Sequence, residues 1–184
     1  MKYPILTFLL FTLTLSSALG QGRFKSTEGS IDFSSDAPLE VIEASSDNLK
    51  GVIDPLSGRF AFSINISSFE GFNSALQKQH FNENYMESGE YPKASFSGKI
   101  IEKIDYDSDG NHTVRAKGDL KVHGVTQNRI IKSKIKINGN KIELSSNFLV
   151  PLIEHDITIP KIVNQKIATE IDVTISAVLE EEEF

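Results

Sequence analysis

The chain has 184 residues, a formal net charge of −6 at pH 7, no cysteine and no tryptophan. An acidic chain is poorly suited to binding nucleic acid, because affinity for nucleic acid comes largely from neutralising phosphates. The lack of cysteine excludes disulfides, a thiol nucleophile and a lipid anchor attached through an N-terminal cysteine.

The chain begins with the pattern of a secretory signal peptide over residues 1–20. An apolar run at 5–15 follows a single lysine, and the small-residue site Ala18-Leu19-Gly20 stands directly before Gln21. The run is shorter than the ~20 apolar residues of a transmembrane helix. The pattern predicts cleavage before Gln21, a periplasmic or secreted protein with no stable membrane span after cleavage, and one domain over residues 21–184.

After the predicted leader, apolar residues recur at every second position, which is the period of half-buried strands. Asn138-Gly139 is the dipeptide favoured in a two-residue type I′ turn, and further turn signals lie at 54–58 and 107–111. Consecutive hairpins with one apolar face predict an all-β fold, an antiparallel sheet of about eight or nine strands that closes on itself. In chain order, the expected strands lie near 29–33, 39–44, 49–53, 59–66, 94–104, 113–122, 131–137, 142–148 and 171–179.

The strand pattern is interrupted between Phe69 and Gly89, where one or two short helices are expected. Phe72, Leu76 and His80 recur at helical spacing, and Asn82 can cap a second helix. A histidine on such an apolar face is most often a hydrogen-bonded core residue, and the alternative is a position beside a ligand head group.

Residues with catalytic or metal-binding chemistry are scattered. Residues 105–110 match the opening of a calcium loop, but Ala116 stands where that loop needs a bidentate glutamate, so an acidic hairpin tip is the favoured interpretation. The four histidines have no metal-ligand spacing, and there is no G-x-S-x-G element. The sequence therefore predicts no metal, no cofactor and no enzymatic activity. A hydrolase would need serine, histidine and carboxylate side chains brought together from distant strands.

Three stretches together resemble the YceI-like family, whose members are exported and have a lipocalin-like antiparallel barrel. The first joins His80-Phe81 to the segment Tyr91-Pro92-Lys93-Ala94-Ser95-Phe96, the second is the segment 116–126 with its His123-Gly124-Val125-Thr126 end, and the third is the opening strand at 29–33.

Two short stretches depart from the family pattern. Residues 77–79 are Gln-Lys-Gln where the family often has Arg-Asp, and residues 82–87 replace its acidic aromatic segment. If these positions touch a ligand head group, a head group different from the family norm is expected.

The resemblance implies binding of a long apolar ligand, a polyisoprenoid or another long-chain lipid, inside the barrel. An eight-stranded barrel is just wide enough for one small ligand, and each buried methylene contributes ~0.8 kcal/mol. The expected cavity-lining residues are Phe60, Phe62, Ile64, Phe72, Leu76, His80, Phe81, Tyr85, Phe96 and Leu120.

The main alternative is an envelope structural or interaction protein whose barrel is filled by its own side chains and holds no ligand. A lid over a hollow barrel and a plug in a solid one need the same apolar residues, so the pattern alone is compatible with both. The sequence is also compatible with a dimer and does not determine the oligomeric state.

Overall fold

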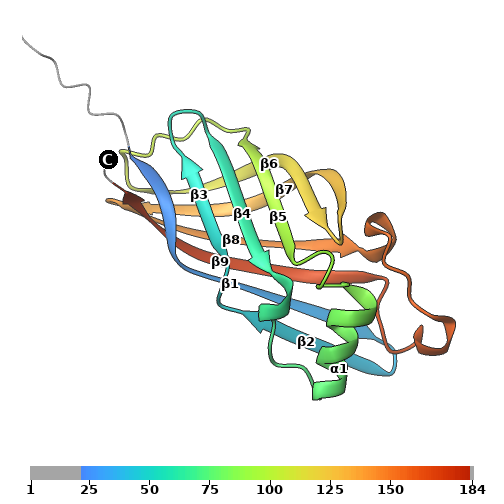
Figure 1. Ribbon diagram of the computed structural model, residues 1–184. Coiled ribbons are helices and arrows are strands. Elements are labelled where there is room, and N and C mark those ends of the chain that lie inside the picture. Colours follow the sequence, from blue (N-terminus) through green and yellow to red (C-terminus); the bar gives the residue numbers. More distant parts are fainter. Residues whose placement is uncertain (1–21, 183–184) are drawn as a thin grey trace, which may run out of the picture.

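The described part of the chain is an antiparallel β-barrel, as the strand pattern predicts (Figure 1). The computed structural model describes residues 22–182, so the predicted signal peptide lies outside the described residues. The strands are β1 (Arg23–Ala37), β2 (Glu40–Ser46), β3 (Lys50–Asp54), β4 (Arg59–Asn65), β5 (Lys93–Ile100), β6 (Gly110–Val122), β7 (Val125–Asn138), β8 (Lys141–Pro151) and β9 (Glu170–Glu182). Eight of them close the barrel, because β1 pairs with β9 on one edge and with β3 on the other.

The ninth strand, β2, extends the sheet beyond the closed barrel. Phe24 and Lys25 at the start of β1 pair with β3, and its second half, from Ile31 to Ala37, pairs with β2. Residues 47–49 interrupt the strand structure between β2 and β3. Within this interruption, the N–H of Leu49 donates to the carbonyl of Gly29 (3.1 Å). A Cβ on Gly29 would lie 2.5 Å from the Leu49 carbonyl oxygen, so this close approach requires glycine. On the β2 side of this interruption the strand lies outside the barrel wall, and β2 does not pair with β4.

One hairpin turn differs from the sequence-based assignment. Asn138 pairs with Lys141, so the two-residue loop is Gly139-Asn140 rather than Asn138-Gly139. Only Gly139 has a positive φ there (58°), as a type II′ turn requires at its first position. The type I′ geometry is found instead at His123-Gly124, where both φ angles are positive (48° and 76°).

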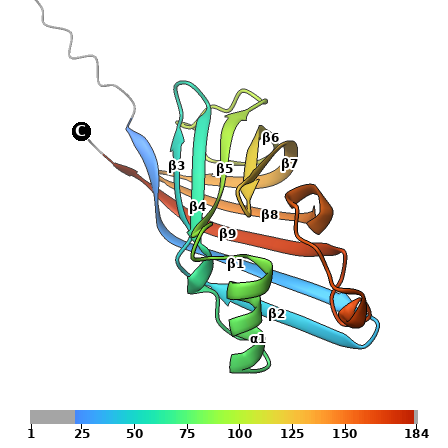
Figure 2. The same ribbon diagram turned by 45° about the vertical axis from the view of Figure 1, so that its right-hand side comes forward.

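A short helical segment lies against the open side of the barrel (Figure 2). Helix α1 (Ala75–His80) begins at Ser74, whose hydroxyl accepts a hydrogen bond from the N–H of Gln77. The helix runs directly into a π-helical turn, η2 (Phe81–Tyr85). Asn82 therefore does not cap a second helix; it lies inside η2 and its side-chain amide donates to the carbonyl of Lys78.

Three single 3₁₀ turns complete the secondary structure: η1 (Ile66–Ser68), η3 (Leu152–His155) and η4 (Lys161–Val163). The last two belong to the long connection between β8 and β9, at the same end of the barrel as α1 (Figure 2). Within residues 22–182, no helix is both long enough and apolar enough to span a bilayer.

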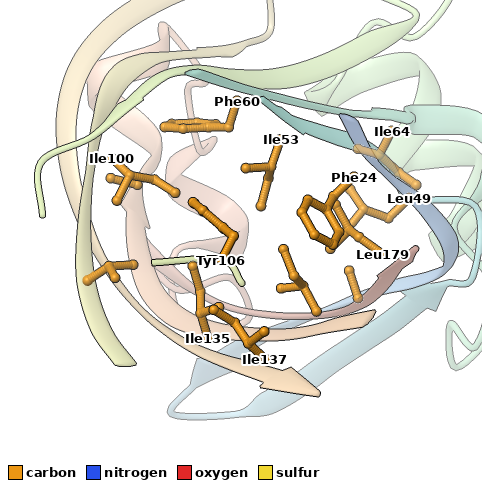
Figure 3. Packing of buried hydrophobic residues seen from close by; sticks show 14 of the residues in the cluster. Phe24, Leu49, Ile53, Phe60, Ile64, Ile100, Tyr106, Ile135, Ile137 and Leu179 are labelled. Carbon is orange, nitrogen blue, oxygen red and sulfur yellow. The ribbon is translucent and has the colours of Figure 1, made fainter. Parts of the chain in front are cut away.

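The end of the barrel that carries the β3–β4 turn is solid. Figure 3 shows its interior filled by aliphatic and aromatic side chains from every wall, among them Phe24, Ile53, Phe60 and Leu179. The β5–β6 connection closes this end with Tyr106, whose ring centroid lies 5.7 Å from that of Phe24. Burial raises the pKa of Tyr106 to about 12, and its hydroxyl has no hydrogen-bond partner among the described residues.

The acidic residues next to Tyr106 stabilise the β5–β6 connection, which carries the Tyr106 side chain. The Asp105 carboxylate accepts hydrogen bonds from the Asp107 N–H (3.2 Å) and the Ser108 hydroxyl (2.7 Å). Asp109 accepts from the N–H of Gly139 in the neighbouring hairpin (2.7 Å). Asp105 thus orders the loop internally and Asp109 fixes it to the β7–β8 turn, in keeping with a hairpin tip.

Replacing Tyr106 tests the closure of the solid end. Tyr106→Phe removes a buried hydroxyl without a partner, so the free energy of unfolding is expected to stay level or rise by about 1 kcal/mol. Tyr106→Ala leaves a cavity and is expected to cost about 3–5 kcal/mol. Urea unfolding of both variants measures this, and a clear loss of stability in Tyr106→Phe would contradict the packing described.

Candidate functional site

The other half of the barrel encloses an apolar cavity of about 460 Å³. This volume lies within the range of roughly 300–1,000 Å³ found for small-molecule sites. Strands β1, β4, β5, β6, β8 and β9 supply its walls, the segment from Phe69 to Met86 covers one side, and the β8–β9 connection covers another. Aliphatic and aromatic side chains dominate its lining, so the cavity suits an apolar ligand.

Nine of the ten residues expected to line a cavity border this one: Phe62, Ile64, Phe72, Leu76, His80, Phe81, Tyr85, Phe96 and Leu120. The exception is Phe60, which is buried in the solid half with its ring centroid 4.9 Å from that of Phe96. Phe60 and Phe62 point inward from the same strand, and the boundary between solid and hollow interior falls between them. His80 is exposed at the cavity mouth and is not a core residue.

Further lining residues were not anticipated from the sequence. They come from β1, β2, β8, β9 and the loops, and include Ile31, Phe33, Ile42, Phe69, Met86, Phe148, Val150, Leu152, Ile157, Ile171, Val173 and Ile175. Those of β8 and β9 follow the alternation that predicts an inward face. Alternation does not distinguish a cavity wall from a packed core, because both present apolar side chains inward.

Aromatic rings of β4 and β5 form the floor of the cavity. Phe62 and Phe96 border the cavity, and Phe60 lies beneath them. The Phe62 ring lies over Gly51 of β3, where a Cβ would come within 2.1 Å of it. Glycine at position 51 therefore lets the ring lie close to the barrel wall and leaves the space above it open.

Four phenylalanines attach the helical segment to the barrel. Phe81 of η2 stacks on Phe33 of β1 with ring centroids 5.3 Å apart, and it also contacts Phe72 (5.0 Å) and Phe69 (5.8 Å). Aromatic pairs in this distance range are favourable beyond their buried area. Ring packing thus holds the segment over the cavity, together with a single backbone bridge between Glu70 and Ser45 of β2.

Three polar side chains that border the cavity contact one another. The side-chain amide of Gln77 on α1 donates to Glu40 of β2 (3.0 Å), and the Lys166 ammonium of the β8–β9 connection lies 3.9 Å from the same carboxylate. All three residues border the cavity. Glu40 therefore joins three separate elements around the opening.

His123, in the His-Gly-Val-Thr stretch, anchors the far end of the helical segment. Its Nδ1 donates to the carbonyl of His155 (3.0 Å), its Nε2 lies 2.7 Å from the Glu87 carboxylate, and Tyr91 packs edge-on against its ring (4.8 Å). Among the described residues, the non-glycine positions with positive φ are Glu87, His123 and Asp156. All three lie in or beside this contact. Backbone strain is therefore concentrated where the helical segment, the β6–β7 turn and the β8–β9 connection meet.

His155 is fully buried beside this contact. Its Nδ1 donates to the carbonyl of Val125 (3.3 Å), and its Nε2 has no partner within the described part of the chain. Burial lowers the pKa of His155 below its ordinary value, with the hydrogen bond to Val125 opposing the shift. The imidazole is therefore neutral in the folded protein at neutral pH.

The buried imidazole predicts a loss of stability on acidification. Because the pKa of His155 is lower in the folded than in the unfolded chain, the unfolded chain binds the proton first. The free energy of unfolding is then expected to fall as pH drops through about 6.5 towards the folded value. Urea unfolding between neutral and mildly acidic pH should show a smaller loss in His155→Gln than in the parent chain. Equal losses would contradict this role.

Comparisons with known proteins agree with the barrel. The family model of the YceI-like domain matches residues 9–179. A polyisoprenoid binding domain from Saccharophagus degradans, implicated in plant cell wall breakdown, superposes with a TM-score of 0.73 at 15% identity, covering 88% of this chain and 99% of that one. BcnA of Burkholderia cenocepacia gives 0.67 at 14% identity, covering 82% and 95%. The YCEI protein of Campylobacter jejuni gives 0.56 at 20% identity over all of both chains. No curated protein sequence matches the chain.

Proposed function

The chain belongs to the YceI-like family, and on that premise we propose that it is an exported carrier that encloses one long apolar chain in the hollow half of its barrel. The ligand class is a polyisoprenoid or another long-chain lipid. The observation that carries the proposal is the apolar cavity of about 460 Å³ between the phenylalanine floor and the α1–η2 segment.

The physical chemistry of the cavity favours a hydrocarbon chain. Burying about ten methylene groups would contribute roughly 8 kcal/mol before the cost of association is subtracted. No directed polar contact along the chain is needed for such affinity. The polar groups at the mouth, Glu40, Gln77 and Lys166, would then meet the more polar end of the ligand. The likeness in fold to a polyisoprenoid binding domain supports this ligand class.

A binding role suits the site better than catalysis. The cavity wall is built of aliphatic and aromatic side chains, and the polar groups of the mouth are paired with one another. Both ring nitrogens of His123 are engaged in structural contacts, Nδ1 with the His155 carbonyl and Nε2 with the Glu87 carboxylate. The alternative of a filled barrel, an interaction protein without ligand, accounts for the solid half of the interior but not for the cavity in the other half.

Export is the second part of the proposal, and it rests on residues 1–20. We propose cleavage before Gln21 and a periplasmic or secreted location. N-terminal sequencing of protein recovered from the exported fraction tests both. Recovery of the chain in the cytoplasm with Met1 intact would refute them.

Native mass spectrometry of protein purified gently from the exported fraction tests the carrier role. We expect one long-chain lipid per protein, released and identified by fragmentation, because the cavity has room for a single chain. Protein that is empty and also ignores added polyprenol would favour the filled-barrel interaction protein.

A paired substitution on β4 tests the position of the ligand. Phe62→Arg places a charge on the cavity floor and is expected to abolish lipid uptake, because a buried unpaired charge is strongly unfavourable in an apolar site. Ala61→Arg, on the neighbouring exposed position, is the matched control and should bind lipid normally. The measurements are lipid content by native mass spectrometry and melting temperature. Normal uptake by a folded Phe62→Arg protein would place the ligand elsewhere.

A further inference from the structure

Exposed aliphatic side chains are concentrated at one end of the molecule. Among residues 22–182, nine large aliphatic side chains are exposed. Leu56 and Ile101 lie at the solid end, in the β3–β4 and β5–β6 connections, and Ile130 and Leu149 stand within β7 and β8. Five belong to elements at the cavity end: Leu39, Val41, Leu76, Ile153 and Ile162. An exposed apolar surface gathered in one place marks an interaction site more often than scattered residues do.

Three of these side chains surround the mouth of the cavity. Leu76 on α1 is exposed and also borders the cavity. Leu39, in the β1–β2 turn, donates its N–H to the carbonyl of Gln165 (2.9 Å), which brings that turn against the connection carrying Ile162. Glu40 links the same elements through Gln77 and Lys166. We call Leu39, Leu76 and Ile162 the rim, together with the exposed Ile153 of η3, which lies in the same β8–β9 connection as Ile162.

We propose that the rim docks on the surface of a lipid bilayer, so that the apolar ligand passes between bilayer and cavity without crossing water. This inference rests on the proposed carrier function, because its purpose is the exchange of a membrane-resident chain. The apolar surface of the cavity continues outward through Leu76 to the rim. A docked rim would therefore place the opening in contact with the acyl region.

The shape of the rim favours a bilayer over a protein partner. The rim residues stand on separate elements: the β1–β2 turn, α1, η3 and η4 (Figure 2). Specific protein interfaces need a packed, complementary core. Isolated aliphatic tips around an opening suit a deformable headgroup layer, into which apolar side chains can insert.

The charge distribution indicates that insertion, rather than electrostatic attraction, drives docking. The chain carries a formal charge of −6, so an anionic bilayer repels it overall. Lys161 and Lys166 stand near Ile162, while Glu154 beside Ile153 is paired with Arg129 (3.0 Å). Attachment should therefore persist at about 1 M salt, where the Debye length is about 3 Å.

Vesicle flotation of matched variants tests the proposal. The parent chain, Ile162→Asp and Leu56→Asp are purified from the exported fraction with the same N-terminus and mixed with vesicles of phosphatidylethanolamine and phosphatidylglycerol. Ile162 is 92% exposed and Leu56 is 73% exposed, so neither change should disturb folding, which melting temperatures verify. We expect Ile162→Asp to lower vesicle partitioning about tenfold, while Leu56→Asp has no effect.

Transfer kinetics supply an independent readout. Protein loaded with a tritium-labelled long-chain polyprenol is mixed with the same vesicles, and the transfer rate is measured against vesicle concentration. Transfer through docking should accelerate in proportion to vesicle concentration, and more slowly in Ile162→Asp. A rate independent of vesicle concentration, or equal effects of the two substitutions, would overturn the proposal.

The outcomes separate this inference from the carrier function. Protein that holds polyprenol but does not float with vesicles refutes bilayer docking alone. Protein that neither holds polyprenol nor floats refutes the carrier function as well. If Ile162→Asp instead dissociates a dimer seen by sedimentation, a second copy of the chain covers the rim and the bilayer proposal fails.

Discussion

The architecture depends on how the two edges of β1 are shared. One edge pairs with β9 from Arg23 to Ser34 and closes the barrel, while the other is divided between β3 and β2. Where β3 is the partner, the wall is complete and side chains from all sides meet in a solid core. Where β2 is the partner, the sheet leaves the barrel and the wall opens towards β4. A single strand thus creates both a packed half and a hollow half.

The opening explains why the segment between β4 and β5 is helical and rich in phenylalanine. It covers a gap in the wall that strand pairing does not close. Apart from two backbone hydrogen bonds between Glu70 and Ser45 of β2, side chains attach it to the barrel. Phe81 packs on Phe33 at one end, and Glu87 reaches His123 at the other. Attachment by rings, a single backbone bridge and a few polar contacts, with left-handed backbone at Glu87 and His123, is more easily opened than a strand ladder. A cover of this kind suits a cavity that must admit a ligand.

Much of this fold is predictable from the alternation of apolar residues, because a period of two and a turn signal together determine a hairpin. Inward faces such as those of β4 and β9 follow from the same alternation. The division of the interior into a solid and a hollow half does not follow from the alternation, because Phe60 and Phe62 are equivalent by sequence. The course of β2 makes Phe60 a core residue and Phe62 part of the cavity wall. The sequence also does not predict that the helix continues through Asn82. Asparagine is favoured at the start of a helix, but it is tolerated inside one where its side chain bonds a carbonyl of the preceding turn.

The two halves also divide the energetic requirements of a carrier. An empty apolar cavity lowers stability, because its lining lacks the contacts that a packed interior would make. A solid half that closes fully, with residues such as Ile53 and Leu179 completely buried, can maintain the fold while the other half remains open. A ligand bound as proposed would restore the missing contacts and raise stability by mass action. A barrel filled at both ends would be more stable but would have no room for a ligand. A barrel hollow throughout would lack a core in the absence of its ligand. The half-filled barrel avoids both of these disadvantages.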